Sequence, residues 1–323
     1  MIPKSEVLSL INNGKRFLIL AHINPDGDAI GSACALRDVL KAKGKEVWVG
    51  CEHQIPNSLA FLEVDWLTYD FHGQLHDIDC VITVDTPTAE RVGSWITFLD
   101  KAPHVISIDH HPSNVGYADA TWCEPEASST GEMIYLLAEA LQVPITRVIA
   151  QSLYLAITTD TGSFQYQNTH AATFRIVANL IETGIDIEHI NELIYSTLRS
   201  QRIHLMKRFL NRVQFEDGGK IAWGYMTRQD LAEEDACYED IEGFVDLIRK
   251  VAGVEIAFFA FQKTENETKF SLRAKGEAKV DTVAAHFGGG GHVKAAGCTV
   301  MKPALDAAVE IVTVIKKERY GYR

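Results

Sequence analysis

The amino-acid sequence predicts an α/β protein built from two domains. Its 323 residues exceed the common size of one domain. In the first half, strongly apolar segments alternate with helical segments, which is typical of a parallel sheet covered on both faces. In the last third, paired strands with intervening helices indicate a second, smaller α/β domain.

In the first half, runs rich in Val, Ile and Leu predict four strands, at residues 15–22, 45–50, 77–85 and 104–109. Helical spacing predicts helices over residues 30–44 and 128–143, the first ending at Gly44 and the second beginning with Ser and Thr capping residues. The next stretch, residues 151–212, is mainly helical, with predicted helices at 151–160, 170–184, 187–196 and 199–213.

Three further strands are predicted beyond this helical stretch, at residues 220–227, 254–263 and 268–276, the last two joined by the polar turn "TENE". Helices are predicted at residues 238–251, 280–287 and 304–318. We therefore expect a first domain over residues 1–190, a helical linker over 191–212 and a second domain over 213–323.

Composition limits the class of protein. The formal net charge is -12, and proteins that bind long nucleic acids usually carry a basic face, so small or short anionic substrates are favoured. The six cysteines are scattered and form no CxxC pair, which favours reduced thiols and a cytoplasmic location. The N-terminus does not resemble a signal peptide, and no apolar stretch approaches the roughly 20 residues that span a bilayer.

Acidic and imidazole side chains recur where apolar segments end. The candidates are His22, Asp26 and Asp28 after the first strand, Asp85 after the third, Asp109, His110 and His111 after the fourth, and Asp160 after the segment "LAITT". In a parallel sheet the carboxyl ends of the strands lie along one edge, so we expect several of these side chains to converge.

Carboxylates gathered in this way repel one another and raise one another's pKa unless cations neutralise them. A mixed set of histidines and carboxylates suits Mn²⁺, Fe²⁺, Co²⁺ or Zn²⁺ better than Ca²⁺, and more ligands than one ion needs indicate a pair of metals. Taken singly, each residue also fits a structural role, such as a turn in "NPDGD" or a cap at Asp85 or Asp160. Their joint position at the ends of apolar runs favours the metal site.

A second candidate site lies in the stretch "HFGGGGHVKAAG". Glycines let the backbone approach a phosphate closely, although a glycine cluster alone more often forms a hinge or turn. With His292 following and Arg273 preceding in "SLRAKG", a phosphate or nucleotide site is favoured, whereas Lys275 and Lys294 are more readily read as solvated charges. Phe164, Tyr166 and Phe287 could stack on a base, but core packing is at least as good an interpretation.

Five motifs in order resemble the DHH phosphoesterase superfamily: "HINPDGDAIGS", "VDTPTAERVG", "SIDHHP" and "TTDTGSF", followed by "FGGGGHVKAAG", which is similar to the glycine-rich motif of its DHHA1 domain. The resemblance covers nearly the whole chain and is strongest to the bacterial nanoRNase/pAp phosphatase group. It implies an N-terminal DHH domain, a smaller C-terminal DHHA1 domain and an active-site cleft between them.

The resemblance also implies a role for each residue. His22, Asp26 and Asp85 would bind a first metal ion, usually Mn²⁺, and Asp28, Asp85, His110 and Asp160 would bind a second, so that Asp85 bridges the two. His111 would face the substrate phosphate or leaving group, and Asp109 would orient a histidine. Substrate binding would fall to Arg273, Gly289, Gly290, Gly291 and His292.

The expected function is therefore metal-dependent hydrolysis of short oligoribonucleotides and of 3′-phosphoadenosine 5′-phosphate (pAp). The expected ligands are short RNA and small nucleotides, with no long nucleic-acid track and no membrane, and relatives imply that a homodimer can form. Alternatives are a phosphodiesterase acting on linear or cyclic diadenylate and a nucleotide sensor without catalysis. A RecJ-type exonuclease would be larger, and a family II pyrophosphatase usually carries a motif resembling "SRKKQ", which is absent here.

Overall fold

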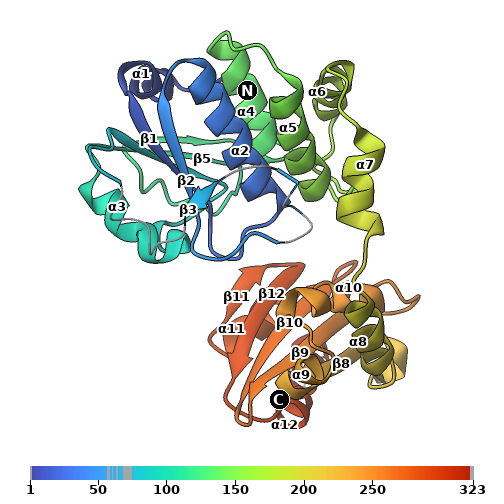
Figure 1. Ribbon diagram of the computed structural model, residues 1–323. Coiled ribbons are helices and arrows are strands. Elements are labelled where there is room, and N and C mark those ends of the chain that lie inside the picture. The colour runs from blue at the N-terminus through green and yellow to red at the C-terminus, as the bar shows by residue number, and fades with distance from the viewer. Residues whose placement is uncertain (1, 57–58, 60, 63–64, 68–74, 321–323) are drawn as a thin grey trace. The chain divides into compact units, whose positions relative to one another are not determined.

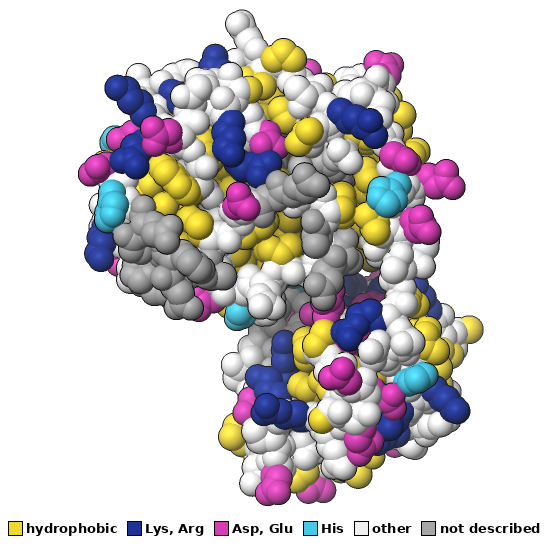
Figure 2. All heavy atoms as spheres, viewed as in Figure 1, with side chains coloured by type: hydrophobic (Ala, Val, Ile, Leu, Met, Phe, Trp, Pro, Cys, Tyr) yellow, Lys and Arg dark blue, Asp and Glu magenta, His cyan; other side chains and the backbone are white. Residues whose placement is uncertain are grey.

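The computed structural model describes residues 2–56, 59, 61–62, 65–67 and 75–320. The chain divides into two compact units, Met1–Thr197 and Leu198–Arg323. Each unit has its own six-stranded sheet and its own buried core. Among the described helices, none is long and apolar enough to cross a membrane. Acidic and basic side chains are interspersed on the face of the chain seen in Figure 2.

The sheet of the first unit is parallel throughout. Its strands are β1 (Arg16–Leu20), β2 (Glu46–Gly50), β3 (Trp66–Leu67), β4 (Cys80–Val84), β5 (His104–Asp109) and β6 (Ala120–Cys123). They lie in the order β3-β2-β1-β4-β5-β6, so the chain first builds outward from β1 in one direction and then from β4 in the other. The boundary between these two halves, at β1 and β4, is where open α/β sheets usually bind ligands.

Helices cover both faces of this sheet because its strands carry apolar side chains on both sides. Phe17 and Ile19 of β1 pack in the core formed with α2, α4 and α5, whereas Leu18 and Leu20 pack against the residues of η3 and α3. Figure 1 shows α2, α4 and α5 lying side by side, in agreement with their packing. The helices of this unit are α1 (Ser5–Asn13), α2 (Gly27–Ala42), η3 (Ala89–Trp95), α3 (Ile96–Lys101), α4 (Thr130–Ala140), α5 (Arg147–Asp160), α6 (Ala171–Glu182), α7 (Ile187–Asn191) and η4 (Glu192–Ser196).

The second unit has a mixed sheet, in which β8 and β9 are parallel and the other neighbours antiparallel. Its strands are β7 (Gln214–Glu216), β8 (Ile221–Thr227), β9 (Ile256–Thr264), β10 (Glu267–Ala274), β11 (Gly290–His292) and β12 (Ala295–Val300), in the order β11-β12-β10-β9-β8-β7. One face packs against residues of α8 (Ser200–Leu210), α9 (Arg228–Glu233), η6 (Tyr238–Ile241) and α10 (Phe244–Arg249). The other packs against α11 (Asp281–His286) and α12 (Ala304–Tyr320), and η5 (Asp217–Gly219) joins β7 to β8.

The sequence predictions of a parallel first sheet, a second α/β unit and the β9–β10 hairpin are confirmed. Five strands were not predicted: β3, β6, β7, β11 and β12. Four of these are too short to show an apolar period: β3 has two residues, β7 and β11 have three each, and β6 has four. The remaining strand, β12, begins with the small residues Ala295, Ala296 and Gly297, which carry little strand propensity.

Candidate metal centre

The switch point of the first sheet carries His22 and Asp85. The backbone pairing of β1 with β4 places the ends of these two strands side by side, and each residue follows its strand directly or within two positions. Asp85 has a left-handed backbone, with φ 55°, a conformation that Asp tolerates better than most residues. Its N–H donates to the carbonyl of Ile108 on β5 (3.0 Å), which fixes the turn against the neighbouring strand.

Asp26 and Asp28 lie at the start of α2. Asp26 is the N-cap residue, whose Oδ1 accepts a hydrogen bond from the N–H of Ala29 (3.0 Å), and Asp28 lies in the first turn. The helix dipole favours negative charge at both positions. Their burial differs sharply, because the Asp26 side chain is 61% exposed and the Asp28 side chain 1%.

Asp85 lies between the two groups of candidate ligands in the centre. Its Oδ2 lies 3.6 Å from His22 Nε2, and its Oδ1 lies 3.5 Å from His110 Nε2. Asp26 Oδ1 lies 3.8 Å from His22 Nε2. Ligand atoms bound to one ion at about 2.1 Å each are separated by roughly 3 to 4 Å, so these spacings suit coordination. The two carboxylate oxygens of Asp85 thus face two different groups of donors.

The second group of donors surrounds His110. Its Nε2 lies 3.8 Å from Asp28 Oδ2 and 3.5 Å from Asp160 Oδ2, in addition to the Asp85 contact. Asp160 is the last residue of α5, so this candidate ligand comes from a helix and not from the sheet. Asn168 Nδ2 donates to Asp160 Oδ2 (3.3 Å) and to the carbonyl of Ser128 (2.8 Å), which holds the end of α5 near the start of α4.

Asp109 orients His111. Asp109 is fully buried, and its Oδ1 accepts from the N–H of His111 (3.1 Å) and lies 2.8 Å from His111 Nδ1. Its other oxygen accepts from Asn114 Nδ2 (2.7 Å). Because Nδ1 is engaged in this way, the Nε2 atom of His111 is the ring nitrogen left for a ligand.

The N-terminus of α4 holds two of the carboxylates, a contribution that the sequence analysis missed. Asp28 accepts from the N–H groups of Thr130 (2.7 Å) and Gly131 (2.9 Å), and from Ser32 Oγ (3.0 Å). The hydroxyl of Thr130 donates to Asp85 Oδ1 (3.0 Å). The stretch "SSTGE" was recognised as a helix cap, but its contact with residues about a hundred positions away depends on how α4 packs.

Burial and crowding disfavour the charged state of three carboxylates before any cation binds, and burial followed by the charge of Asp85 raises the pKa of Asp26. Burial, and then the charges of Asp85 and Asp160, raise the pKa of Asp28 well above its usual range. Burial, opposed by the His110 imidazole and reinforced by the Asp85 charge, raises the pKa of Asp160 to about 6. Such a cluster is relieved by divalent cations, which return all four carboxylates to the charged form.

Three further groups are shifted toward charge. Burial opposes protonation of His22, but its hydrogen bond to Asp85 and the charges of Asp26 and Asp85 outweigh burial and raise its pKa. Burial opposes the charged form of Asp85, but hydrogen bonding to His22 and the charges of His110 and His111 outweigh it and lower its pKa. Burial likewise opposes protonation of His111, yet its hydrogen bond to Asp109 and the charge of Asp85 raise its pKa to about 9. His111 is therefore a protonated donor near neutral pH in the unloaded centre.

The donor set fits the predicted cations. Three groups each have donor atoms within 4.8 Å of one another: His22, Asp26 and Asp85; Asp28, His110 and Asp160; and Asp85, His110 and His111. Imidazole nitrogens mixed with carboxylate oxygens suit Mn²⁺ and related ions better than Ca²⁺.

Arg273 and His292 of the second unit lie in register across its sheet. Arg273 on β10 is opposite Ala295 on β12, which is opposite His292 on β11, so both side chains project from the same face. His292 is exposed, and Arg273 is 32% exposed with Asp246 of α10 at 3.9 Å.

The glycine run follows helix α11 and enters the edge strand β11, so it does not open a helix. Gly291 has φ 139°, and an added Cβ there would lie 2.6 Å from the Ala295 carbonyl oxygen. At Gly289 a Cβ would lie 2.2 Å from the carbonyl oxygen of Gly297. Around Gly290 the space is open. Glycine at positions 289 and 291 therefore lets the backbone of the run pack closely against β12.

The other residues considered from the sequence have partners in the protein. Lys294 Nζ contacts the carbonyls of Gly276 and Ala278, and Lys275 Nζ that of Val251. The aromatic rings Phe164 and Phe287 pack against the hydrophobic cores, while Tyr166 is 56% exposed.

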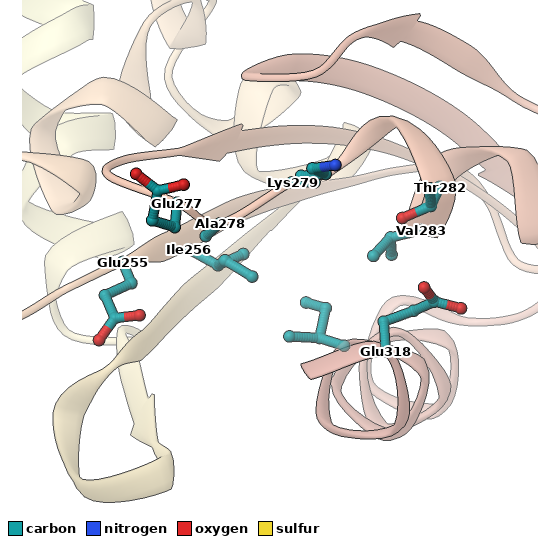
Figure 3. Close-up of a pocket in the computed structure, with 9 residues that line it drawn as sticks. Glu255, Ile256, Glu277, Ala278, Lys279, Thr282, Val283 and Glu318 are labelled. Carbon is teal, nitrogen blue, oxygen red and sulfur yellow. The ribbon is translucent and has the colours of Figure 1, made fainter. Parts of the chain in front are cut away.

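A cavity of about 490 Å³ lies elsewhere in the second unit (Figure 3). It is lined by Glu255, Ile256, Glu277, Ala278, Lys279, Thr282, Val283, Ile315 and Glu318. None of the lining residues belongs to the metal centre or to the Arg273–His292 row, and carboxylates predominate among its charged groups. This cavity does not suit an anionic substrate.

The fold and the centre together define a two-domain α/β protein whose parallel sheet presents a histidine–aspartate site suited to divalent cations. The chain belongs to the DHH family of phosphoesterases: the family's N-terminal domain matches residues 16–157, and the DHHA1 domain matches residues 218–318. This confirms the family that the five sequence motifs indicated.

Individual relatives agree with this assignment. The chain is 33% identical to a bifunctional oligoribonuclease and PAP phosphatase NrnA of Thermus thermophilus, over 94% of this chain and 91% of the relative. A solved structure of an exopolyphosphatase-related protein from Bacteroides fragilis superposes with a TM-score of 0.90 at 27% identity, covering 97% of this chain and 95% of that one. The cyclic-di-AMP phosphodiesterase GdpP of Bacillus subtilis is 25% identical over 93% of this chain but only 47% of the relative.

Proposed function

We propose that this protein hydrolyses short oligoribonucleotides to mononucleotides and pAp to AMP and phosphate, using two divalent cations, preferably Mn²⁺. The observation that carries the proposal is the geometry of Asp85, whose two oxygens lie 3.6 and 3.5 Å from the Nε2 atoms of two different histidines. A carboxylate placed in this way is suited to bridge two ions about 3.5–4 Å apart. The relative with the same pair of activities, at 33% identity over nearly the whole chain, supports the choice of substrates.

In this mechanism His22, Asp26 and Asp85 hold one cation, and Asp28, Asp85, His110 and Asp160 hold the other. When bound, the cations supply an activated water and neutralise charge at the scissile phosphate. The backbone N–H groups at the start of α4 fix Asp28 in place and favour its charged form, and the hydroxyl of Thr130 restrains Asp85.

The histidine oriented by Asp109 supplies the protein's own acid. His111 has Nε2 free, so its ring can hydrogen-bond to a phosphate oxygen and, when protonated, can donate a proton to the departing nucleoside oxygen. Asp109 stabilises the protonated ring and fixes its orientation, and does not itself transfer the proton.

Substrate binding by the second unit is proposed for Arg273 and His292, with Gly289, Gly290 and Gly291 beside them. The two side chains share one face of the sheet, and β11 is an edge strand whose outer backbone groups have no neighbouring strand in the described sheet. A guanidinium and an imidazole beside an edge strand together suit a terminal phosphate or a base edge.

A second candidate is a phosphodiesterase acting on linear or cyclic diadenylate. The similarity to a cyclic-di-AMP phosphodiesterase over 93% of this chain favours it. A nucleotide sensor without catalysis is disfavoured because binding alone does not require a donor set for two cations.

The test is a panel of initial rates with Mn²⁺ on pAp, pApA, cyclic diadenylate, pyrophosphate and a long RNA, with the Asp85→Asn variant as the inactive control. Highest kcat/KM on pAp and pApA supports the proposal. Highest kcat/KM on cyclic diadenylate selects the second candidate. No Mn²⁺-dependent hydrolysis of any substrate rejects both enzymes.

A further inference from the structure

Arg91 lies beside the metal centre without an acidic partner. It belongs to η3, which follows Asp85 and β4 closely, and its side chain is exposed. Its Nη2 lies 3.1 Å from His22 Nδ1. Among the described residues, no carboxylate lies within ion-pairing distance of Arg91, although carboxylates crowd the adjoining centre.

The contact with His22 cannot satisfy the guanidinium. His22 Nδ1 also lies 2.8 Å from the carbonyl oxygen of Ile23, which can only accept a hydrogen bond. The carbonyl contact is the shorter of the two and favours the tautomer with the proton on Nδ1, which leaves Nε2, the atom that faces Asp26 and Asp85, with the lone pair for a metal. A protonated Nδ1 has no lone pair with which to accept a hydrogen bond from the N–H groups of Arg91.

The backbone around Arg91 is fixed in place. Its carbonyl accepts from the N–H of Ile23 (2.7 Å), which links the loops that follow β1 and β4. Two residues on, Gly93 has φ 64°, and an added Cβ there would lie 3.0 Å from the side chains of Glu52 and Ile23. Glu52 accepts from Ser94 through both the N–H and the hydroxyl. The Arg91 side chain thus starts from a rigid turn beside the centre.

Charge balance indicates what this guanidinium binds. The four carboxylates of the centre, Asp26, Asp28, Asp85 and Asp160, carry four negative charges, which two divalent cations would cancel. A phosphate ester then adds one or two negative charges that the centre does not offset. Arginine is suited to this role because it stays charged and presents paired N–H donors to phosphate oxygens.

We propose that Arg91 is a substrate-binding residue that donates hydrogen bonds to non-bridging oxygens of the reacting phosphate. This inference rests on the proposed function, since it assumes a phosphate at the centre. Arg91 would be a cationic contact for the substrate on the His22 side of the centre. It belongs to the first unit, whereas Arg273 and His292 belong to the second.

The test compares the full-length wild type with Arg91→Ala and Arg91→Lys, and with Arg175→Ala on the exposed face of α6 as a matched control. Calorimetry measures Mn²⁺ binding first, and then inorganic phosphate binding to the Mn²⁺-loaded protein; KM and kcat are measured on pAp. In Arg91→Ala, we expect phosphate affinity and 1/KM to fall about tenfold or more while Mn²⁺ affinity is retained. Arg91→Lys should lie between the two, and Arg175→Ala should match wild type.

Unchanged phosphate affinity in Arg91→Ala would overturn the proposal. So would a parallel loss of Mn²⁺ affinity, which would mean that Arg91 only supports His22. Absence of hydrolysis by the wild type would reject the proposed function instead, and the phosphate-binding comparison would still decide the role of Arg91.

Discussion

Asp85 is the residue on which both groups of donors depend. It is 2% exposed, and its oxygens also meet the Thr130 hydroxyl and the His111 ring. Replacing it removes a ligand from both proposed cation sites at once, whereas replacing Asp26 or Asp160 removes a ligand from one. Loss of this residue should therefore affect the number of ions bound as well as the rate.

We expect Asp85→Asn to lower kcat on pAp by about a thousandfold or more with Mn²⁺ in excess, because a neutral amide binds cations poorly and does not bridge them. Calorimetry should show fewer than two ions bound per chain, and circular dichroism should show an intact fold, since the amide keeps the side-chain shape. Substantial turnover in Mn²⁺-replete buffer would contradict the bridging role.

At the scale of elements, the centre depends on how closely α4 approaches α5. An added Cβ at Gly131 would lie 2.4 Å from the Ala156 methyl group and 3.5 Å from Asp28 Oδ1. The glycine therefore lets the first turn of α4 reach the Asp28 carboxylate, to which it donates through its own N–H.

We predict that Gly131→Ala moves the start of α4, weakens Mn²⁺ binding and destabilises the fold by about 1–3 kcal/mol, the usual range for overpacking. Titration with Mn²⁺ and urea unfolding measure the two effects. The double variant Gly131→Ala/Ala156→Gly removes the opposing methyl group and should recover much of the metal affinity. If the single variant binds Mn²⁺ as tightly as wild type, close approach of these helices is not required.

In the second unit, α8 is tied to the start of α9 by an ion-pair network. Asp230 is 3% exposed and accepts from Arg208 (2.9 Å), from Arg212 (2.6 and 2.9 Å) and from the N–H of Thr227 (2.7 Å). Burial opposes its charged form, but these hydrogen bonds outweigh burial and lower its pKa. Its charge therefore contributes to the stability of the folded state.

The sign of the pH dependence follows from the lowered pKa. The stabilisation is fully present above the unfolded-state pKa of about 3.9 and is lost as the pH falls toward the lower folded-state value. We expect Asp230→Asn to reduce the free energy of unfolding by about 2–3 kcal/mol at about pH 7, and by clearly less at about pH 3. Urea unfolding of the full chain measures the difference, with the exposed Glu265→Gln as control. Equal losses at both pH values would contradict the charge-based account.

The sequence predicted the long strands and helices of this fold because their apolar residues follow a regular period. It also indicated that His22, Asp85 and Asp109 lie at or just beyond strand ends, where parallel strands bring residues together. The supporting contacts were not predictable in the same way. Thr130 and Gly131 meet Asp28 only because α4 packs beside α2, and the position of Arg91 against His22 depends on a left-handed turn at Gly93.

At the scale of the whole molecule, the charge of -12 restricts how the protein can recognise nucleic acid. Binding a long strand gains affinity from each phosphate that meets a cation, and this requires a continuous basic track. The cationic groups proposed here are few, namely Arg91, Arg273 and His292. They suit a ligand with one or two phosphates beside the reacting one.

We therefore predict that kcat/KM on a strand of about 20 nucleotides is about tenfold or more below that on a dinucleotide, because the added phosphates gain no cations and repel the acidic surface. Raising the salt concentration should screen that repulsion, so the long substrate should lose less than the dinucleotide, which depends on its few cationic contacts. Initial rates on both substrates across a salt series, at fixed free Mn²⁺, measure this. Equal efficiency on the two lengths, or a steep fall with salt for the long strand alone, would point instead to a basic track and would refute short-substrate selection by charge.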